Sequence, residues 1–369
     1  MQRIGFVGWR GMVGSVLMER MTSERDWKGF DPTFFSTSQA GMAPPKVGLD
    51  APLVVNAKDL TALATQDVIV SCQGSEYTSE IHPKLRKEGW KGIWIDAAKT
   101  LRMSDDAIII LDPVNMPMIE RGLAKGIRDF AGGNCTVSLM VMAMAGPMKQ
   151  GWVEWISSMT YQAASGAGAK NMQELAAQMR ALSDAVGTLA TDPAANVLEL
   201  DRAIQGAMRS PEFPTQQFGA ALAPSLIPWI DEGMASGQTL EEWKAQVEAN
   251  KMLGLDPEIP IDGICVRVGA MRCHSQGLTI KMKRAVPIDE LKACIKESNA
   301  WAKVIPNEME ATKKYLTPAA VTGTLDVAIG RIHTLKMGPE YVGAFTVGDQ
   351  LLWGAAEPLR RMMRIVLER

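Results

Sequence analysis

A glycine-rich turn at the start of the chain constrains the fold more than any other feature. Residues 3–8, RIGFVG, predict a short apolar strand that ends in glycine, and VLMERM then continues in a helical rhythm. Gly8, Gly11 and Gly14 stand between the two in the order G-x-x-G-x-x-G, a variant of the G-x-G-x-x-G fingerprint. Glycines let the backbone approach a pyrophosphate, and a helix N-terminus supplies free N–H groups. The turn therefore predicts a dinucleotide-binding βαβ unit.

The same alternation of strand and helix continues through the first 130 residues. A strand is expected in each of four later segments, 32–41, 67–90, 92–102 and 107–115, and the last contains the fully apolar run AIIIL that suits a parallel sheet. Strands that alternate with helical stretches form βαβ units. We therefore expect an α/β protein whose N-terminal domain is doubly wound and Rossmann-like.

After residue 133 the pattern changes to that of an α+β domain with a mixed sheet. Residues 152–175 predict a strand, a Gly/Ala/Ser-rich loop and a helix, and residues 170–250 are mostly helical. Residues 264–286 alternate as two antiparallel strands. The final helix carries Leu, Met and Ile along one face, so we expect it to pack back on the first domain.

The residues that follow the second expected strand bear on the choice of cofactor. A site for NAD places an acid there to hold the ribose 2′-hydroxyl, whereas this chain has Ser36, Thr37 and Ser38, with Arg10 in the first turn. Hydroxyls and a guanidinium suit a 2′-phosphate, which favours NADP; a plain turn is the alternative. Gln73 ends another expected strand, where open α/β sheets bind ligands.

The segment AGGNCTVSLM, residues 131–140, carries the strongest candidate for chemistry. Asn134 is a good helix N-cap after a Gly-Gly turn, and an uncharged run follows Cys135. Free N–H groups at a helix start favour an anion, so we expect the Cys135 thiol to have a lowered pKa and to act as a nucleophile. The alternative is an inert cysteine beside a buried helix.

Five residues elsewhere are candidate partners of this cysteine. A distant base such as His274 can serve a single cysteine, although a hydrogen-bonded core histidine is the alternative. Arg267 lies among the apolar residues of an expected strand, so it needs an anion, either a structural carboxylate or a ligand. Arg102 ends a loop where the ligand crevice is expected. Glu241 and Lys244 are three residues apart on an expected helix, a spacing that by itself fits a solvated ion pair.

Composition narrows the class of protein. With 39 Lys+Arg against 41 Asp+Glu, the net charge of −2 gives no electrostatic footprint for nucleic acid or an acidic membrane. Five cysteines in 369 residues make no disulfide framework and no zinc spacing, which indicates a reducing cytoplasm and no metal. The start lacks the pattern of a secretory signal, and Gly and Pro interrupt the longest uncharged stretch, 130–148, so no membrane span is expected.

The chain carries, in order and over nearly its whole length, the motifs GFVGWRGMVGSVLMERM, FFSTSQAG, GGNCTVSLM, YQAASGAGAKNM, SLIPWID, EEWK, CVRVGAMRCHSQ, TPAAVTGTL and FTVGDQLLWGAAEPLRRM. Together they resemble the aspartate-β-semialdehyde dehydrogenase family in its bacterial, Gram-negative-type branch. The resemblance implies reductive dephosphorylation of L-aspartyl 4-phosphate to L-aspartate 4-semialdehyde through a cysteine thioester. This reaction serves the biosynthesis of lysine, threonine, methionine and diaminopimelate.

The resemblance also implies roles for individual residues. The family's nucleophile, its general acid/base and the residue that orients the intermediate match, in turn, Cys135, His274 and Gln162. Its binders of the amino-acid end of the substrate match Arg267 and Glu241, and its phosphate site matches Arg102 and Lys244. Its NADP contacts match Gly8, Arg10, Gly11, Met12, Val13, Thr37, Ser38, Gln73, Ser165, Gly166, Ala167, Gly168, Ala169, Pro193 and Gln350.

The resemblance further implies NADP(H) as cofactor, inorganic phosphate as a substrate, no metal and a cytoplasmic homodimer. The implied domains are 1–133 plus 357–369 for NADP binding, and 134–356 for catalysis and dimerisation. Three alternatives stay open. One is another acyl-phosphate reductase, of the acetylglutamyl-phosphate type. The others are a Cys-His hydrolase or acyltransferase, which would not need the glycine turn, and a dinucleotide-binding regulator without catalysis.

Overall fold

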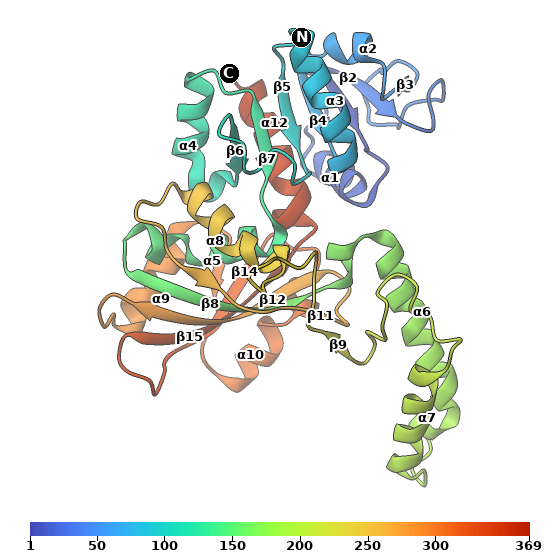
Figure 1. Ribbon diagram of the computed structural model, residues 1–369, viewed down its shortest axis with the longest axis vertical. Coiled ribbons are helices and arrows are strands. Elements are labelled where there is room, and N and C mark those ends of the chain that lie inside the picture. Colours follow the sequence, from blue (N-terminus) through green and yellow to red (C-terminus); the bar gives the residue numbers. More distant parts are fainter.

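A seven-stranded parallel sheet forms the N-terminal part of the computed structural model, which describes residues 1–369 (Figure 1). The strands run in the order β3-β2-β1-β4-β5-β7-β6. Their bounds are β1 (Gln2–Val7), β2 (Phe30–Ser36), β3 (Val55–Asn56), β4 (Val68–Ser71), β5 (Ile93–Asp96), β6 (Ala107–Ile110) and β7 (Asp129–Gly132). Because the chain moves from β1 first to β2 and later to β4, strand order reverses beside β1, where such sheets bind ligands. The predicted doubly wound domain is confirmed.

Helices cover both faces of this sheet because its strands are apolar on both sides. Phe34 packs with residues of α1 (Met12–Ser23) and α12 (Glu357–Leu367), while its neighbour Phe35 packs on the opposite face with α2 (Leu60–Ala64) and α3 (Ser75–Lys87). α4 (Asp112–Ala124) lies near the C-terminal end of α12 (Figure 1). The final helix packs back on the first domain as predicted; the exact domain boundaries stay a prediction.

A second, mixed sheet of eight strands forms the other half of the molecule. Its order is β13-β14-β15-β12-β8-β11-β9, with β10 beside β8. The bounds are β8 (Val153–Gln162), β9 (Leu226–Ile227), β10 (Ile261–Asp262), β11 (Cys265–Val268), β12 (Cys273–Met282), β13 (Ala302–Val304), β14 (Val327–Thr334) and β15 (Tyr341–Asp349).

The expectation of two antiparallel strands in residues 264–286 is only half right. β11 and β12 form, but they do not pair with each other, because β8 lies between them. β8 pairs with β11 in parallel and with β12 antiparallel. Strand periodicity reports which residues alternate, not which strand is the neighbour.

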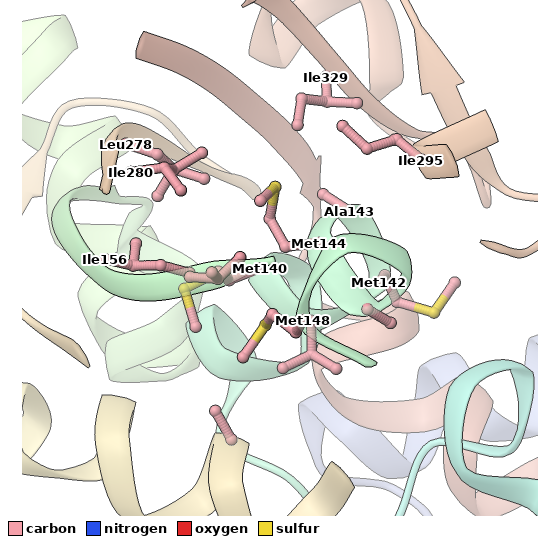
Figure 2. Close-up of a cluster of buried hydrophobic side chains, with 14 of the residues drawn as sticks. Met140, Met142, Ala143, Met144, Met148, Ile156, Leu278, Ile280, Ile295 and Ile329 are labelled. Atoms are coloured by element: carbon pink, nitrogen blue, oxygen red, sulfur yellow. The ribbon is translucent and has the colours of Figure 1, made fainter. Parts of the chain in front are cut away.

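The core of the second half is built around α5 (Cys135–Lys149). Nearly every residue of this helix is buried, as expected for a helix that is apolar all round. Figure 2 shows its methionines, Met140 and Met144 among them, in one cluster with Ile156 and Leu278 of the sheet. α8 (Leu240–Leu253) and α9 (Ile288–Ser298) also pack on α5. Flexible, unbranched methionine side chains fill much of this core.

A helical arm projects from the second half of the molecule (Figure 1). It consists of α6 (Ala169–Val186), the 3-10 turn η2 (Gly187–Ala190) and α7 (Val197–Arg209), which has no buried residue. The remaining elements are the 3-10 turn η1 (Ala164–Ala167), α10 (Met309–Tyr315), α11 (Pro318–Val321) and the π-helical turn η3 (Leu352–Ala356). None of the helices is both long enough and apolar enough to cross a bilayer.

Candidate active site

A cavity of about 540 Å³ opens between the two halves of the molecule. Residues from both halves line it, and they come from strand ends, helix starts and the turns between them. Its walls comprise Met12, Val13, Ala97, Lys99, Arg102, Asn134, Cys135, Gln162, Ser165, Gly166, Ala167, Gly168, Ile230, Asp231, Glu241, Lys244, Arg267, Gln350, Gly354 and Ala355. The structure thus brings most of the expected catalytic, substrate and cofactor residues to one place. His274, which the resemblance matches to the general acid/base, lies just behind these lining residues, in contact with Cys135.

The sulfur of Cys135 lies 3.1 Å from Nε2 of His274. The other ring nitrogen, Nδ1, accepts a hydrogen bond of 2.9 Å from the backbone N–H of Ala163. A nitrogen that accepts a hydrogen bond holds no proton, so the neutral ring carries its proton on Nε2, facing the sulfur. Burial and the charge of Arg267 both lower the pKa of His274 well below 6.5, which keeps the imidazole neutral.

The predicted lowering of the Cys135 pKa is wrong for this state of the protein. Burial and the nearby charge of Glu241 raise the pKa of the thiol to about 12, against the opposing charges of Arg267, Arg102 and Lys244. The helix start offers less than expected because the Asn134 side chain already accepts hydrogen bonds from the N–H groups of the next turn. The cap prediction itself is confirmed, and Cys135 is the first residue of α5.

Glu241 and Lys244 form a buried pair that faces the cavity, not the solvated pair that their spacing alone suggested. Each is 6% exposed, and Lys244 Nζ lies 3.0 Å from Glu241 Oε2. Asn134 Nδ2 and Gln162 Nε2 donate to Glu241 Oε1 at 3.0 and 3.2 Å. Burial raises the pKa of Glu241, but Lys244 and these donors outweigh it and lower the pKa, so the carboxylate stays charged.

Arg267 is a buried guanidinium without a carboxylate partner. It is 7% exposed, and its Nη1 donates to the backbone oxygen of Ala163 at 2.8 Å. No carboxylate lies within ion-pair distance of it, whereas every other cation in the cavity has one. Of the two partners that the sequence left open, a structural carboxylate is therefore ruled out. A buried, unpaired charge is costly, so the guanidinium is positioned for an anion from solution.

The other cations of the cavity are held by carboxylates. Arg102 contacts Glu248 at 3.2 Å and donates to the backbone oxygen of Gly132 at 2.7 Å. Glu248 also accepts the backbone N–H of Asn134, which ties this pair to the start of α5. Arg102 and Lys244 thus reach the cavity from opposite halves of the molecule.

The turn between β1 and α1 fits a dinucleotide pyrophosphate. Gly8 has φ 71°, and a Cβ on it would lie 2.6 Å from the backbone of Gln73. A Cβ on Gly14 would lie 2.2 Å from the oxygen of Gly8, so both positions need glycine. No side chain caps α1, which leaves its first N–H groups free for a ligand. The residues present therefore fit the cofactor.

A second set of expected cofactor residues lies across the cavity from this turn. Gln350 Nε2 donates to Ser165 Oγ at 2.7 Å, which joins the end of β15 to η1. Gly166 lies so close to Arg267 and His274 that a Cβ would approach both within 3.0 Å. Ala169 begins α6 directly after this glycine-rich segment.

The remaining expected cofactor residues lie outside the cavity. Arg10, Thr37 and Ser38 are exposed at the ends of the paired strands β1 and β2, at the same edge of the sheet. Pro193 is exposed in the arm between η2 and α7, and the structure does not bring it to this cavity. Its assignment as a cofactor contact stays a prediction.

Sequence reasoning missed Lys99, Asp231 and Glu248. Lys99 lies three residues after the last residue of β5, and its place near the C-terminal end of a parallel strand is a signal that could have singled it out. Asp231 belongs to the SLIPWID motif, but nothing in that segment indicates which side chain faces a site. No group of three His, Cys, Asp or Glu side chains in residues 1–369 is arranged to hold a metal ion.

Comparison with known protein families matches both halves of the chain. The model for the semialdehyde dehydrogenase NAD-binding domain matches residues 3–121, and that for the semialdehyde dehydrogenase dimerisation domain matches residues 146–353. The fold and the site therefore place the chain in a class of two-domain oxidoreductases, the semialdehyde dehydrogenases.

Solved structures narrow this class. Aspartate semialdehyde dehydrogenase from Francisella tularensis is 49% identical with a TM-score of 0.94, over 99% of this chain and 100% of that one. The chain belongs to the aspartate-semialdehyde dehydrogenase family. Two more distant structures share the fold, each covering 100% of this chain and 99% of their own. They are aspartate semialdehyde dehydrogenase II from Vibrio cholerae complexed with ASA (21% identity, TM-score 0.80) and the Candida albicans enzyme with NADP (15%, 0.65).

Proposed function

We propose that this protein reduces L-aspartyl 4-phosphate to L-aspartate 4-semialdehyde with NADPH and releases inorganic phosphate. The observation that carries the proposal is the unpaired, buried guanidinium of Arg267 in the same cavity as the Cys135–His274 pair. A planar guanidinium suits a bidentate grip on the substrate α-carboxylate, and Glu241 suits the ammonium group beside it. Lysine, threonine, methionine and diaminopimelate biosynthesis use this product.

Acyl transfer begins at the sulfur. The Cys135 sulfur attacks the carbonyl carbon of the acyl phosphate, and the carbon–oxygen bond to phosphate breaks to leave a thioester. The thiol proton passes to the departing phosphate, which leaves as hydrogen phosphate. Arg102 and Lys244 hold the departing phosphate.

Reduction follows at the same carbon, and bound NADPH supplies the hydride. As the thioester carbonyl is reduced, its oxygen takes on negative charge, and the Nε2 proton of His274 is placed to donate to it. The carbon–sulfur bond then breaks, which releases the aldehyde and leaves the Cys135 sulfur as a thiolate, and the thiolate takes up a proton from solvent to restore the thiol. We therefore assign His274 chiefly to hydrogen-bond donation. A general base at Nε2 would first have to move its proton to Nδ1, against the N–H of Ala163.

Dimerisation is proposed for the outer face of the mixed sheet. Met159 and Tyr161 of β8 are 40% and 39% exposed there, and Phe345 of β15 packs beside Tyr161. An apolar, aromatic sheet face that one chain leaves open is typical of an interface. The match of residues 146–353 to a dimerisation domain supports this placement.

The decisive experiment is run in the oxidative direction. Purified protein is given L-aspartate 4-semialdehyde and NADP⁺, and formation of NADPH is followed by absorbance with and without inorganic phosphate. Sustained turnover that requires phosphate supports the proposal, and N-acetylglutamate semialdehyde serves as the competing substrate. Preference for that substrate would favour the acetylglutamyl-phosphate type. Hydrolysis of an acyl substrate without NADP⁺ would favour a Cys-His hydrolase.

A further inference from the structure

Lys99 and Lys244 share one carboxylate at the mouth of the cavity. Oδ2 of Asp231 lies 2.6 Å from Nζ of Lys244 and 3.4 Å from Nζ of Lys99. Lys244 comes from α8 in the second half of the molecule, whereas Lys99 follows β5 in the first half. One oxygen anion thus bridges two ammonium groups from opposite walls.

We propose that Lys99 is a third cation of the phosphate subsite and that the Asp231 carboxylate stands in for a phosphate oxygen while the subsite is empty. The inference rests on the proposed function, since it extends the subsite of Arg102 and Lys244. An oxygen held between two lysine ammonium groups is the arrangement that a bound phosphate oxygen would also have.

The three cations differ in how freely they can exchange partners. Arg102 is fixed by Glu248 and by the backbone oxygens of Gly132 and Ala97. The side chain of Lys99 is 46% exposed and has only Asp231 as a partner, so it can turn toward an incoming anion at little cost. A dianion that enters beside Lys244 is therefore within reach of Lys99.

Asp231 is held in place by its own loop and not by the lysines alone. It has φ 70°, a left-handed conformation that is uncommon outside glycine, and its backbone oxygen accepts a hydrogen bond from Trp229 Nε1 at 3.0 Å. Its Oδ1 accepts the backbone N–H of Glu232 at 3.0 Å. Although partial burial raises its pKa, Lys244 and the other donors lower it overall, so this anion competes with phosphate for the same cations.

The test measures KM for inorganic phosphate in the oxidative reaction of the full-length protein. Lys99→Ala should raise that KM about fivefold or more, while kcat at saturating phosphate and KM for the semialdehyde change less than twofold. Lys99→Arg should restore most of the loss, because it keeps the charge. Lys91→Ala is the matched control, since Lys91 is exposed just before the other end of β5.

A second variant tests whether the Asp231 carboxylate occupies the place of a phosphate oxygen. Asp231→Asn removes the competing charge and should lower KM for phosphate about twofold or more. An unchanged phosphate KM in Lys99→Ala, or a phosphate KM raised more than twofold in Asp231→Asn, would overturn the inference. If the wild-type protein itself shows no phosphate-dependent turnover, the proposed function fails instead, so the two failures are distinguishable.

Discussion

The backbone N–H of Ala163 donates to Nδ1 of His274, and this contact determines which ring nitrogen carries the proton next to Cys135. The neighbouring backbone oxygen of Ala163 accepts from Arg267. One peptide segment at the end of β8 therefore orients both the imidazole and the expected carboxylate anchor.

The first prediction concerns this imidazole and pH. Because its folded pKa lies below the unfolded value of 6.5, neutral His274 contributes stability that is complete above pH 6.5 and is lost as pH falls. Wild-type protein should therefore lose unfolding free energy relative to His274→Gln as pH decreases from 6.5. Denaturant melts of both proteins at several pH values measure this. Curves that stay parallel at all pH values would contradict the low pKa of His274.

The second prediction concerns the sulfur as nucleophile. Cys135→Ala should reduce turnover by about 10³-fold or more, because no other group in the cavity can form the thioester. Binding of NADPH, measured by fluorescence, should remain. Cys294→Ala is the control, since this cysteine lies on α9, outside the cavity. Substantial residual activity in Cys135→Ala would contradict the assignment of Cys135 as the nucleophile.

The third prediction concerns the reactivity of the same thiol in the empty protein. With its pKa raised to about 12 from 9.0, Cys135 should be alkylated by iodoacetamide roughly a thousandfold more slowly at pH 7 than an ordinary thiol. Glu241→Gln removes a charge that raises this pKa and should accelerate labelling. Mass spectrometry of the Cys135 peptide gives the rate. Labelling of Cys135 as fast as that of a free peptide thiol would show that the pKa of Cys135 is not raised.

The fourth prediction concerns the unpaired guanidinium. Arg267→Lys keeps the charge but loses the planar fork, so kcat/KM for the semialdehyde should fall at least tenfold, about 1.4 kcal/mol in transition-state binding. Arg284→Lys is a matched control, because Arg284 lies outside the cavity and its ion pair with Glu290 is exposed. Unchanged kinetics in Arg267→Lys would rule out a direct grip on the carboxylate.

Local rules were enough to predict the parts of the site that depend on neighbouring residues. The strand, turn and helix around Gly8 and the cap at Asn134 follow from residue types within a few positions. The pKa of Cys135 could not be predicted in this way, since it depends on burial and on Glu241, which is more than a hundred residues away. The contact of Lys99 with the Asp231 carboxylate joins positions 132 residues apart, and no periodicity indicates such a pair.

The C-terminal end of β8 connects the cavity with the outer face of the mixed sheet. Gln162 points into the reaction chamber and pairs in register with Arg267, while Tyr161, one peptide unit earlier, points out to the open sheet face. Side chains on a strand alternate between the two faces of the sheet. A register shift of one residue would therefore exchange Gln162 and Tyr161 and remove the Gln162 amide from Glu241. A partner surface that binds against Tyr161 therefore contacts the same strand that positions Gln162. We expect a substitution on this outer face to lower turnover before it lowers the free energy of unfolding.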